Sequence, residues 1–281
     1  MGSILVAALL SFTAFGQSNP EWRSWNQPVT PFRIMGNLYY VGASDIASYL
    51  IVTSKGLIVL DGGFVETAPM IEKNIATLGL KVSDVRILLN SHAHFDHAGG
   101  LAELKQKSGA ALYAGKGDVN LLARGGAGDP QMGDEGRFPS VVVDHAVSDG
   151  DRVTLGGTTV VAHATPGHTE GDTTWSTRVI DGGHTYDVVI SGSASVPGNF
   201  RLAHVDGYPA IISDYRKAFA TLRALPCDVF LAVHGGFFDL RGKSQRLAKG
   251  ERPNPFIDPA GYQLYVSQTV EAFEKKLATG K

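Results

Sequence analysis

One short segment of the chain gathers four side chains that could bind metal ions. Residues 90–100 read Asn-Ser-His-Ala-His-Phe-Asp-His-Ala-Gly-Gly, so three histidines and one aspartate fall within six residues. Imidazole nitrogens and carboxylate oxygens are the ligands that zinc and similar divalent metals prefer. Four ligands exceed what one open site uses, which predicts a centre with more than one metal ion; the alternative is a polar loop with satisfied histidines. The four are His92, His94, Asp96 and His97.

An α-helix would not gather these side chains, because helical spacing points His94 away from His92 and leaves only His92 and Asp96 on one face. A tight loop at the end of a strand can turn all four toward one point. The apolar run 85–89 predicts that strand directly before the cluster. The glycine pair 99–100 follows the cluster and lets a helix begin close to the metal. We therefore expect the ligands on a strand-to-helix loop.

Two further histidines stand where predicted strands end. His168 lies in a Pro-Gly-His-Thr loop after the β-prone run 159–163, and His234 follows the buried run 229–233 and precedes two glycines. Ligands in α/β folds collect at such strand ends. A lone histidine after a strand is usually structural. The upstream metal site needs more ligands, however, which favours a metal-binding role for both histidines. Four histidines lack this context and are expected to be ordinary surface or core residues: His145, His163, His184 and His204.

Three other segments are open to more than one interpretation. Asp61 ends the β-prone run 56–60 and is expected to support the site rather than to bind metal. Residues 20–31 are interrupted by prolines and predict an extended arm over the body, in which Trp25 either packs as core or lines a pocket. Residues 125–139 contain five glycines and two prolines, which indicates either a lid or substrate wall or a plain insertion.

The remaining pattern predicts strands followed by a helix in each half of the chain. This order indicates a two-sheet α/β sandwich, with the candidate ligands at one edge between the halves. The predicted strands are 38–41, 47–52, 56–60, 85–89, 111–114, 141–143, 153–155, 159–163, 185–191 and 229–233; the predicted helices are 69–80, one that ends near 109, 116–124, 212–225 and 258–277.

Composition limits the classes of partner. The 281 residues are 43% hydrophobic and 19% charged, which is ordinary for a globular protein, and no linker divides the chain into domains. The net charge of −2 offers no electrostatic basis for binding nucleic acid or an anionic membrane. Cys227 is the only cysteine, so an intramolecular disulfide and a cysteine-rich zinc knuckle are excluded, and we expect it to be a small buried residue.

The N-terminus has the pattern of an export signal. Residues 4–10 are apolar, and Ala14-x-Gly16 resembles a cleavage site before Gln17. No lysine or arginine precedes Arg23, which suggests an altered start at residues 1–3. The apolar run is too short to span a bilayer. We therefore expect a signal peptide at 1–16, one domain at 17–281, a periplasmic or secreted location and no stable membrane association.

The set of candidate ligands resembles the metallo-β-lactamase superfamily. The resemblance rests on His92-x-His94-x-Asp96-His97, then His168 and His234, and Asp-Gly-Gly at 61–63 and Asp-Gly-Asp at 149–151 extend it over essentially the whole mature chain. It implies an αβ/βα sandwich with a dinuclear site at the sheet edge. Two metals so held usually sit ~3.5–4 Å apart and share an activated water.

Residue 193 distinguishes between the branches of this superfamily. Thioesterases of the glyoxalase II type, lactonases and nucleases carry a metal-bridging aspartate where this chain has Ser193 after Gly192. Subclass B1 β-lactamases have a cysteine there, and Cys227 lies well beyond this position. With Asp96 and His97 both present, the chain is similar to subclass B3 zinc β-lactamases.

That resemblance implies roles for nine residues. One zinc ion would take His92, His94 and His168, and a second would take Asp96, His97 and His234. Ser193 and Ser195 would hold the substrate carboxylate, and the Asn199 amide could donate to the developing oxyanion.

The implied activity is hydrolysis of penicillins, cephalosporins and carbapenems by a zinc-activated hydroxide, which confers antibiotic resistance and needs no covalent acyl-enzyme. The implied partner is the small-molecule β-lactam, with no protein partner. Two alternatives remain: a lactonase or glyoxalase II-like thioesterase on the same metals, and a non-catalytic periplasmic zinc-binding protein.

Overall fold

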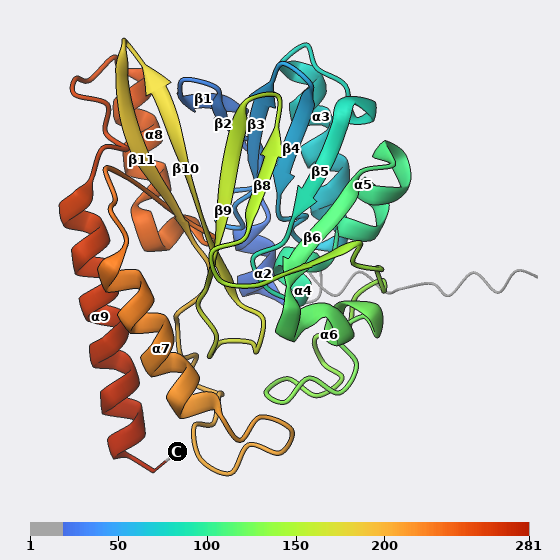
Figure 1. Ribbon diagram of the computed structural model, residues 1–281, viewed down its shortest axis with the longest axis vertical. Coiled ribbons are helices and arrows are strands. Elements are labelled where there is room, and N and C mark those ends of the chain that lie inside the picture. Colours follow the sequence, from blue (N-terminus) through green and yellow to red (C-terminus); the bar gives the residue numbers. More distant parts are fainter. Residues whose placement is uncertain (1–18, 281) are drawn as a thin grey trace, which may run out of the picture.

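The computed structural model describes residues 19–280, so the expected signal peptide at 1–16 lies outside the described residues. Two β-sheets pack against each other, and helices cover their outer faces (Figure 1). Helices α3 (Ala68–Thr77) and α5 (Leu101–Ser108) lie beside the first sheet, and α7 (Ile211–Ala224) and α9 (Pro259–Ala278) lie beside the second. This arrangement is the α/β sandwich that the sequence predicts.

The first sheet holds seven strands in chain order. Its first four strands form an antiparallel meander, whereas β4 to β7 are parallel. Because parallel strands end at the same edge of a sheet, the residues that follow β4 and β5 come together there. The strands are β1 (Phe32–Met35), β2 (Leu38–Tyr40), β3 (Tyr49–Thr53), β4 (Gly56–Leu60), β5 (Val85–Leu89), β6 (Ala111–Gly115) and β7 (His145–Val147).

The second sheet has the strand order β12-β11-β10-β9-β8. Strands β9 and β11 are both antiparallel to β10, and β12 is parallel to β11, so β9, β11 and β12 run in one direction. Their carboxyl ends deliver His168, Ser193 and His234 to one edge. The strands are β8 (Arg152–Leu155), β9 (Thr158–Ala164), β10 (Thr173–Asp181), β11 (His184–Ser191) and β12 (Val229–Ala232).

Both faces of the first sheet are buried. Along β4, Ile58 and Leu60 join the core between the two sheets, whereas Leu57 and Val59 join the core beneath α3 and α5. This alternation follows from the two-residue period of a strand. A strand buried on both faces reads as the continuous apolar run seen in the sequence.

The sequence predicted the start of a helix accurately where a capping residue marks it. The carboxylate of Asp258 accepts a hydrogen bond from the backbone N–H of Gly261, and Pro259 occupies the first turn of α9. Smaller helices fill the connections: α4 (Phe95–Ala98), α6 (Val119–Ala123), α8 (Leu240–Ala248), η1 (Val65–Thr67), η2 (Val82–Asp84), η3 (Lys116–Asp118) and η4 (Gly235–Phe238). Neither α8 nor β10 was predicted.

Two predictions about secondary structure were wrong. Residues 20–31 do not form an extended arm throughout, because Pro20–Trp25 is a helix, α2, capped by the side chain of Asn19. A proline is tolerated in the first helical turn, where its missing N–H costs no intrahelical bond. The run 141–143 is not a strand: Val142 is 70% exposed, and the sheet adds β7 instead.

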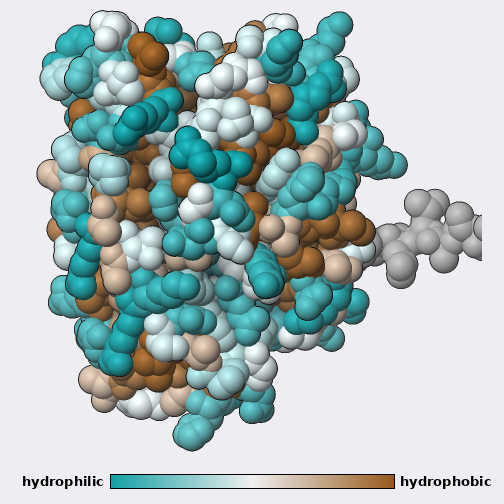
Figure 2. All heavy atoms as spheres, in the orientation of Figure 1, coloured by the Kyte–Doolittle hydropathy of each residue, from teal (hydrophilic) through white to brown (hydrophobic). Residues whose placement is uncertain are grey.

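The molecular surface interleaves hydrophilic and hydrophobic side chains on the face shown in Figure 2. Among the described residues, the large hydrophobic side chains that are exposed are Val142, Ile180 and Leu264, which lie far apart in the sequence. No helix in the described part of the chain combines the length and the apolar character needed to cross a membrane.

Candidate metal centre

The segment between β5 and α5 carries the four clustered candidate ligands, but only two of them lie on the loop that the sequence predicts for all four. His92 and His94 lie on the irregular part of the loop, and Asp96 and His97 lie on α4. The loop lies tightly against the end of β4. A Cβ atom on Gly100 would collide with the carbonyl oxygen of Gly62, which explains the need for glycine there.

Three histidines form the first group of donors. The loop after β9 brings His168 to His92 and His94, and one ring nitrogen of each lies within 4.8 Å of the others. His94 Nδ1 and His168 Nε2 are 3.1 Å apart. All three residues are at most 8% exposed.

The second group contains Asp96, His97 and His234. His97 Nε2 lies 3.3 Å from His234 Nε2, and Asp96 Oδ2 lies 3.4 Å from the first of these nitrogens and 3.5 Å from the second. His92 also lies within 4.8 Å of Asp96 and His97, so the two groups adjoin. We assign His92 to the first group because the short distances of 3.3–3.5 Å join the other three residues.

These distances fit metal ions. Ligands about 2.0–2.1 Å from a zinc ion in a tetrahedron are about 3.3–3.4 Å from one another. Two imidazole nitrogens that face each other at 3.1–3.3 Å either share a proton in a hydrogen bond or direct their lone pairs at a cation between them. The chemistry of the donors, five imidazoles and one carboxylate, suits zinc.

Each of the five histidines turns its second ring nitrogen toward a supporting group. Such partners fix the tautomer and the orientation of metal-binding histidines. The partners are Ser91 Oγ at 3.1 Å and Asp172 at 3.6 Å for His92, Asp129 at 3.5 Å for His94, Asp61 at 3.7 Å for His97, the Ser195 carbonyl at 3.0 Å for His168, and Asp45 at 2.8 Å for His234. Asp61 thus supports the site, as expected.

The electrostatics of the site prepare its donors for a cation. Burial and the neighbouring histidines hold the pKa values of His92 and His168 well below the usual range, so both rings are neutral at pH 7. Burial acts in the opposite direction on Asp96, but His97 keeps the pKa of this carboxyl far below its usual range. Neutral imidazoles and an ionised carboxylate are the forms that bind a metal.

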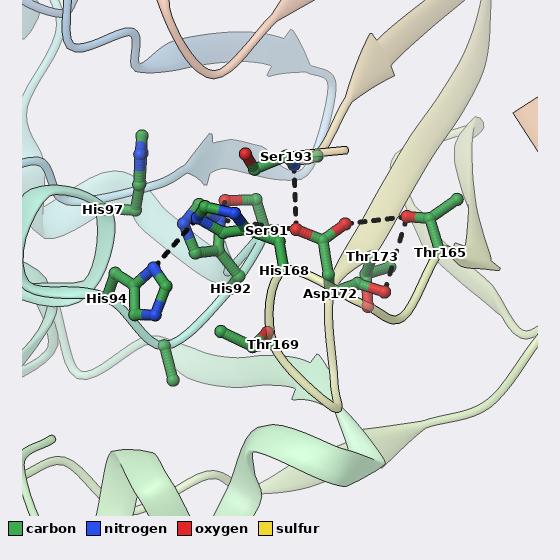
Figure 3. A network of polar contacts seen from close by, with 12 residues as sticks. Ser91, His92, His94, His97, Thr165, His168, Thr169, Asp172, Thr173 and Ser193 are labelled. Carbon is green, nitrogen blue, oxygen red and sulfur yellow. Dashed lines mark hydrogen bonds and ion pairs between the residues drawn. The ribbon is translucent and has the colours of Figure 1, made fainter. Parts of the chain in front are cut away.

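Two buried carboxylates join the metal-binding loops to each other. Asp172 accepts hydrogen bonds of 2.8 Å from Thr165 Oγ1 and from the backbone N–H of Ser193 (Figure 3). Asp118 accepts from the backbone N–H groups of Ala93 and Gly171 and from the hydroxyl of a threonine, at 2.7–2.8 Å. The loops after β5, β9 and β11 are thereby tied together.

Sequence reasoning assigned no role to four of these supporting residues. Asp172 stands four residues after His168 in a Gly-Asp pair, and only this proximity to a candidate ligand could have indicated its role. Asp45, Asp118 and Asp129 lie in segments without a chemical motif.

A cavity of about 360 Å³ opens over both groups of donors. Trp22 and Trp25 of α2 form one wall: Trp22 packs 4.6 Å from Phe95 and Trp25 packs edge-on 5.5 Å from His234, both measured between ring centroids. Of the two interpretations of Trp25, the structure favours the pocket wall. The rest of the lining includes His94, Asp96, His168, Ser195, Asn199, Phe200 and Phe237.

The three predicted substrate-binding residues lie at different depths. Ser195 and the exposed Asn199 line the cavity, whereas Ser193 is 1% exposed and lies behind it. The hydroxyl of Ser193 is 3.0 Å from that of Ser195. Ser193 therefore lies one hydroxyl contact behind the lining of the cavity.

The loop 125–139 lies against the cavity. Met132 lines the cavity, and the side-chain amide of Gln131 donates to the carbonyl of Arg201 and accepts from its N–H, at 2.7 and 2.8 Å. Of the two interpretations of this loop, the structure favours a wall of the site over a plain insertion.

The residues expected to have ordinary roles lie outside both groups of donors. His145 stacks on Tyr113, and His163 contacts Ser176 at 2.8 Å. Cys227 is half-buried against the core, and burial raises the pKa of its thiol to about 12. A larger cavity of about 650 Å³ on the second sheet contains one histidine, His163.

Comparison with known proteins yields one family. Residues 41–234 match the family model described as the Metallo-beta-lactamase superfamily. Solved structures that share the fold include three metallo-beta-lactamases. The native FEZ-1 metallo-beta-lactamase from Legionella gormanii is 43% identical, with a TM-score of 0.88 over 91% of this chain and 98% of that one.

BJP-1, a subclass B3 metallo-beta-lactamase of Bradyrhizobium japonicum, is also 43% identical, with a TM-score of 0.86 over 91% of this chain and 96% of that one. The class B3 di-zinc metallo-beta-lactamase LRA-12 from an Alaskan soil metagenome is 35% identical, with a TM-score of 0.86 over 92% of this chain and 97% of that one.

Matches to curated sequences cover less of the chain. The "Probable metallo-hydrolase YqgX" of Bacillus subtilis is 26% identical over 163 residues, which are 56% of this chain and 70% of that protein. A hydroxyacylglutathione hydrolase of Rhodospirillum rubrum is 33% identical over 84 residues, which are 30% of this chain and 26% of that protein.

Proposed function

This chain belongs to the Metallo-beta-lactamase superfamily, and from that premise we propose that it is a hydrolase that opens the β-lactam ring of antibiotics with two zinc ions. The observation that carries the proposal is the likeness to FEZ-1, BJP-1 and LRA-12, at 35–43% identity over 91–92% of this chain and at least 96% of each of those three. The proposed substrates are penicillins, cephalosporins and carbapenems, and their hydrolysis would confer resistance.

The proposed ligands of the first zinc ion are His92, His94 and His168, and those of the second are Asp96, His97 and His234. A bound zinc ion would polarise a carbonyl group and lower the pKa of a water molecule to about 7. The chain contributes neutral imidazoles at His92 and His168, an ionised Asp96 and a polar partner beside the second nitrogen of each ring.

Other side chains position the substrate. The hydroxyl of Ser195 would donate to the substrate carboxylate, with Ser193 orienting that hydroxyl from behind. Asn199 at the rim would donate to the carbonyl oxygen of the lactam. The apolar walls from Trp25, Phe200 and Phe237 would pack on the substituents and exclude water from the reacting bond.

A thioesterase of the hydroxyacylglutathione hydrolase type is the second candidate, because curated enzymes of that name match 84 residues of the chain. Ser193 argues against it. In the resemblance drawn from the sequence, thioesterases carry a bridging aspartate at this position, and a serine hydroxyl cannot replace that negative charge.

Hydrolysis of a chromogenic cephalosporin tests the proposal. We expect turnover by the zinc-loaded protein, loss of turnover in a chelator and recovery when zinc is added back. A parallel assay with a glutathione thioester separates the second candidate. Bound zinc without hydrolysis of either substrate would leave the non-catalytic zinc-binding protein and would contradict both enzyme proposals.

We also propose that the chain is exported. The support is the apolar segment at 4–10 and the small residues at 14 and 16. Mass spectrometry of the protein from a periplasmic fraction should find a first residue of Gln17. An intact N-terminus on protein confined to the cytoplasm would contradict export.

A further inference from the structure

The outward nitrogen of His94 faces the carboxylate of Asp129. His94 Nε2 is buried and makes no hydrogen bond within the usual limits, and Asp129 Oδ2 lies 3.5 Å away. Both side chains are 5% exposed. A buried imidazole N–H without an acceptor is costly, so this carboxylate is the group placed to satisfy it.

The structure of the loop aims the second oxygen of Asp129 at His94. Asp129 Oδ1 accepts hydrogen bonds of 2.7 Å from the backbone N–H groups of Gln131 and Met132. The backbones of Asp129 and Gly133 bond to each other in both directions, at 3.1 and 2.8 Å, and close the turn. Gly133 has a φ of +60°, a conformation that favours glycine. Oδ2 is thus the oxygen left for the histidine.

The same turn reaches the walls of the cavity. Met132 lines the cavity directly, and the Gln131 side chain is bonded to the backbone of Arg201. Arg201 follows Phe200, whose ring stacks on that of His168 with centroids 5.0 Å apart. One turn therefore faces a ligand of the first metal group, lines the cavity through Met132 and is bonded to the residue after Phe200.

We propose that Asp129 is a positioning residue that accepts the Nε2 proton of His94 and keeps Nδ1 of that ring free to bind the first metal. The loop 125–139 thereby couples the cavity wall to the metal centre. This inference rests on the proposed metal site, but it does not depend on the identity of the substrate. Loss of such an outer partner typically lowers metal affinity by about 10- to 100-fold.

Two substitutions separate a hydrogen-bonding role from a packing role. Asp129→Ala removes the acceptor together with the anchor of the turn. Asp129→Asn retains an oxygen for the N–H groups of Gln131 and Met132 and presents an amide N–H₂ to His94. That donor favours the tautomer in which Nδ1 carries the proton and cannot bind metal. A merely structural role predicts that Asn is tolerated; the positioning role predicts that Asn is as harmful as Ala.

The control is Asp134→Asn, in the same loop. The Asp134 carboxylate accepts a hydrogen bond from the backbone N–H of Gly128, not from His94. Metal-free protein is titrated with zinc against a chromophoric chelator, and NMR of ¹⁵N-labelled histidine in the zinc-loaded protein follows the His94 Nε2 proton. We expect about 10- to 100-fold weaker binding at one site in both Asp129 variants. The protected Nε2 proton should be lost in both, through rapid exchange in Asp129→Ala and through rapid exchange or the other tautomer in Asp129→Asn. The control should show neither change.

Unchanged zinc affinity together with a protected His94 proton in Asp129→Asn would overturn the inference. Thermal unfolding of the metal-free variants identifies any loss of fold, and Asp129→Asn remains the deciding variant if Asp129→Ala does not fold. A protein that fails to hydrolyse β-lactams but loses zinc affinity in both variants would contradict the proposed function and leave this inference intact.

Discussion

The carboxylate of Asp118 accepts a hydrogen bond of 2.8 Å from the backbone N–H of Ala93, the residue between the first two candidate ligands. The same oxygen accepts from the hydroxyl of Thr169, and the other oxygen accepts from the N–H of Gly171. A residue that is 1% exposed thus fixes the backbones beside His94 and His168 relative to each other. The geometry of the first metal group depends on it.

Replacement of this carboxylate should destabilise the fold. Asp118→Asn replaces one carboxylate oxygen with an NH₂ group, which then faces the buried N–H or O–H donors that the oxygen had accepted from. This change should lower the free energy of unfolding by about 2–4 kcal/mol. Urea denaturation of the metal-free protein measures the change. The control Glu103→Gln removes an exposed ion pair with Lys107 and should leave the free energy of unfolding almost unchanged. Equal effects of the two substitutions would contradict a stabilising role for the buried hydrogen bonds of Asp118.

Asp96→Ala should remove one ligand and the negative charge of the second metal group. We expect the bound metal to fall toward one equivalent and turnover of a cephalosporin to fall by at least about 100-fold. Metal analysis after dialysis and steady-state kinetics check both. The control His163→Ala removes a histidine outside the centre, which contacts Ser176, and should retain metal and turnover. A variant with two metals and full turnover would refute the ligand assignment.

Ser195→Ala should impair substrate binding more than chemistry. The loss of one hydrogen bond to the substrate carboxylate, worth about 1 kcal/mol, predicts a KM about 5-fold higher with little change in kcat. A substrate whose carboxylate is esterified should show no such difference between variant and parent. A 5-fold effect that persists with the ester would mean that Ser195 acts elsewhere.

The ion pair between Lys243 and Asp258 should make stability depend on pH. Lys243 is 2% exposed, and its ammonium lies 2.8 Å from the carboxylate that caps α9. Burial opposes ionisation of Asp258, but Lys243 and the N–H of Gly261 lower the pKa of the carboxyl below its usual value. The pair therefore adds stability above the unfolded pKa of about 3.9, and that stability is lost as the pH falls through the lower folded pKa.

Asp258→Asn tests this sign, because the amide oxygen can still cap α9 at Gly261. The variant should be less stable than the parent by on the order of 1 kcal/mol at pH 6, and the difference should shrink toward pH 3. Urea denaturation at both pH values measures it. A gap that widens as the pH falls would show that the assigned direction of the pKa shift is incorrect.

Local pattern was sufficient to predict most elements and the metal-binding loop. The apolar run before His92, the glycine pair after it and the Asp258-Pro259 start of the last helix are signals contained within a few residues. Local geometry, hydrophobic period and capping determine such features directly. The family resemblance added the division of the ligands into two groups, which spacing alone had left open.

Where two local signals favoured different secondary structures, the sequence did not decide between them. Prolines in 20–31 suggested an extended arm, yet Pro20 begins a helix whose tryptophans cover the cavity. The valines at 141–143 have strand propensity, but the sheet pairs β6 with 145–147 instead. Propensity is a weak prior, and tertiary packing decides between alternatives of similar local energy.

The sequence by itself determined which side chains could bind metal, because their types and spacing are local. Only the tertiary structure decided what holds them. Asp45 meets His234 across 189 residues, and Asp118 meets Thr169 across 51. A supporting carboxylate has no motif of its own, since its role arises only when connections from both sheets meet at a common edge.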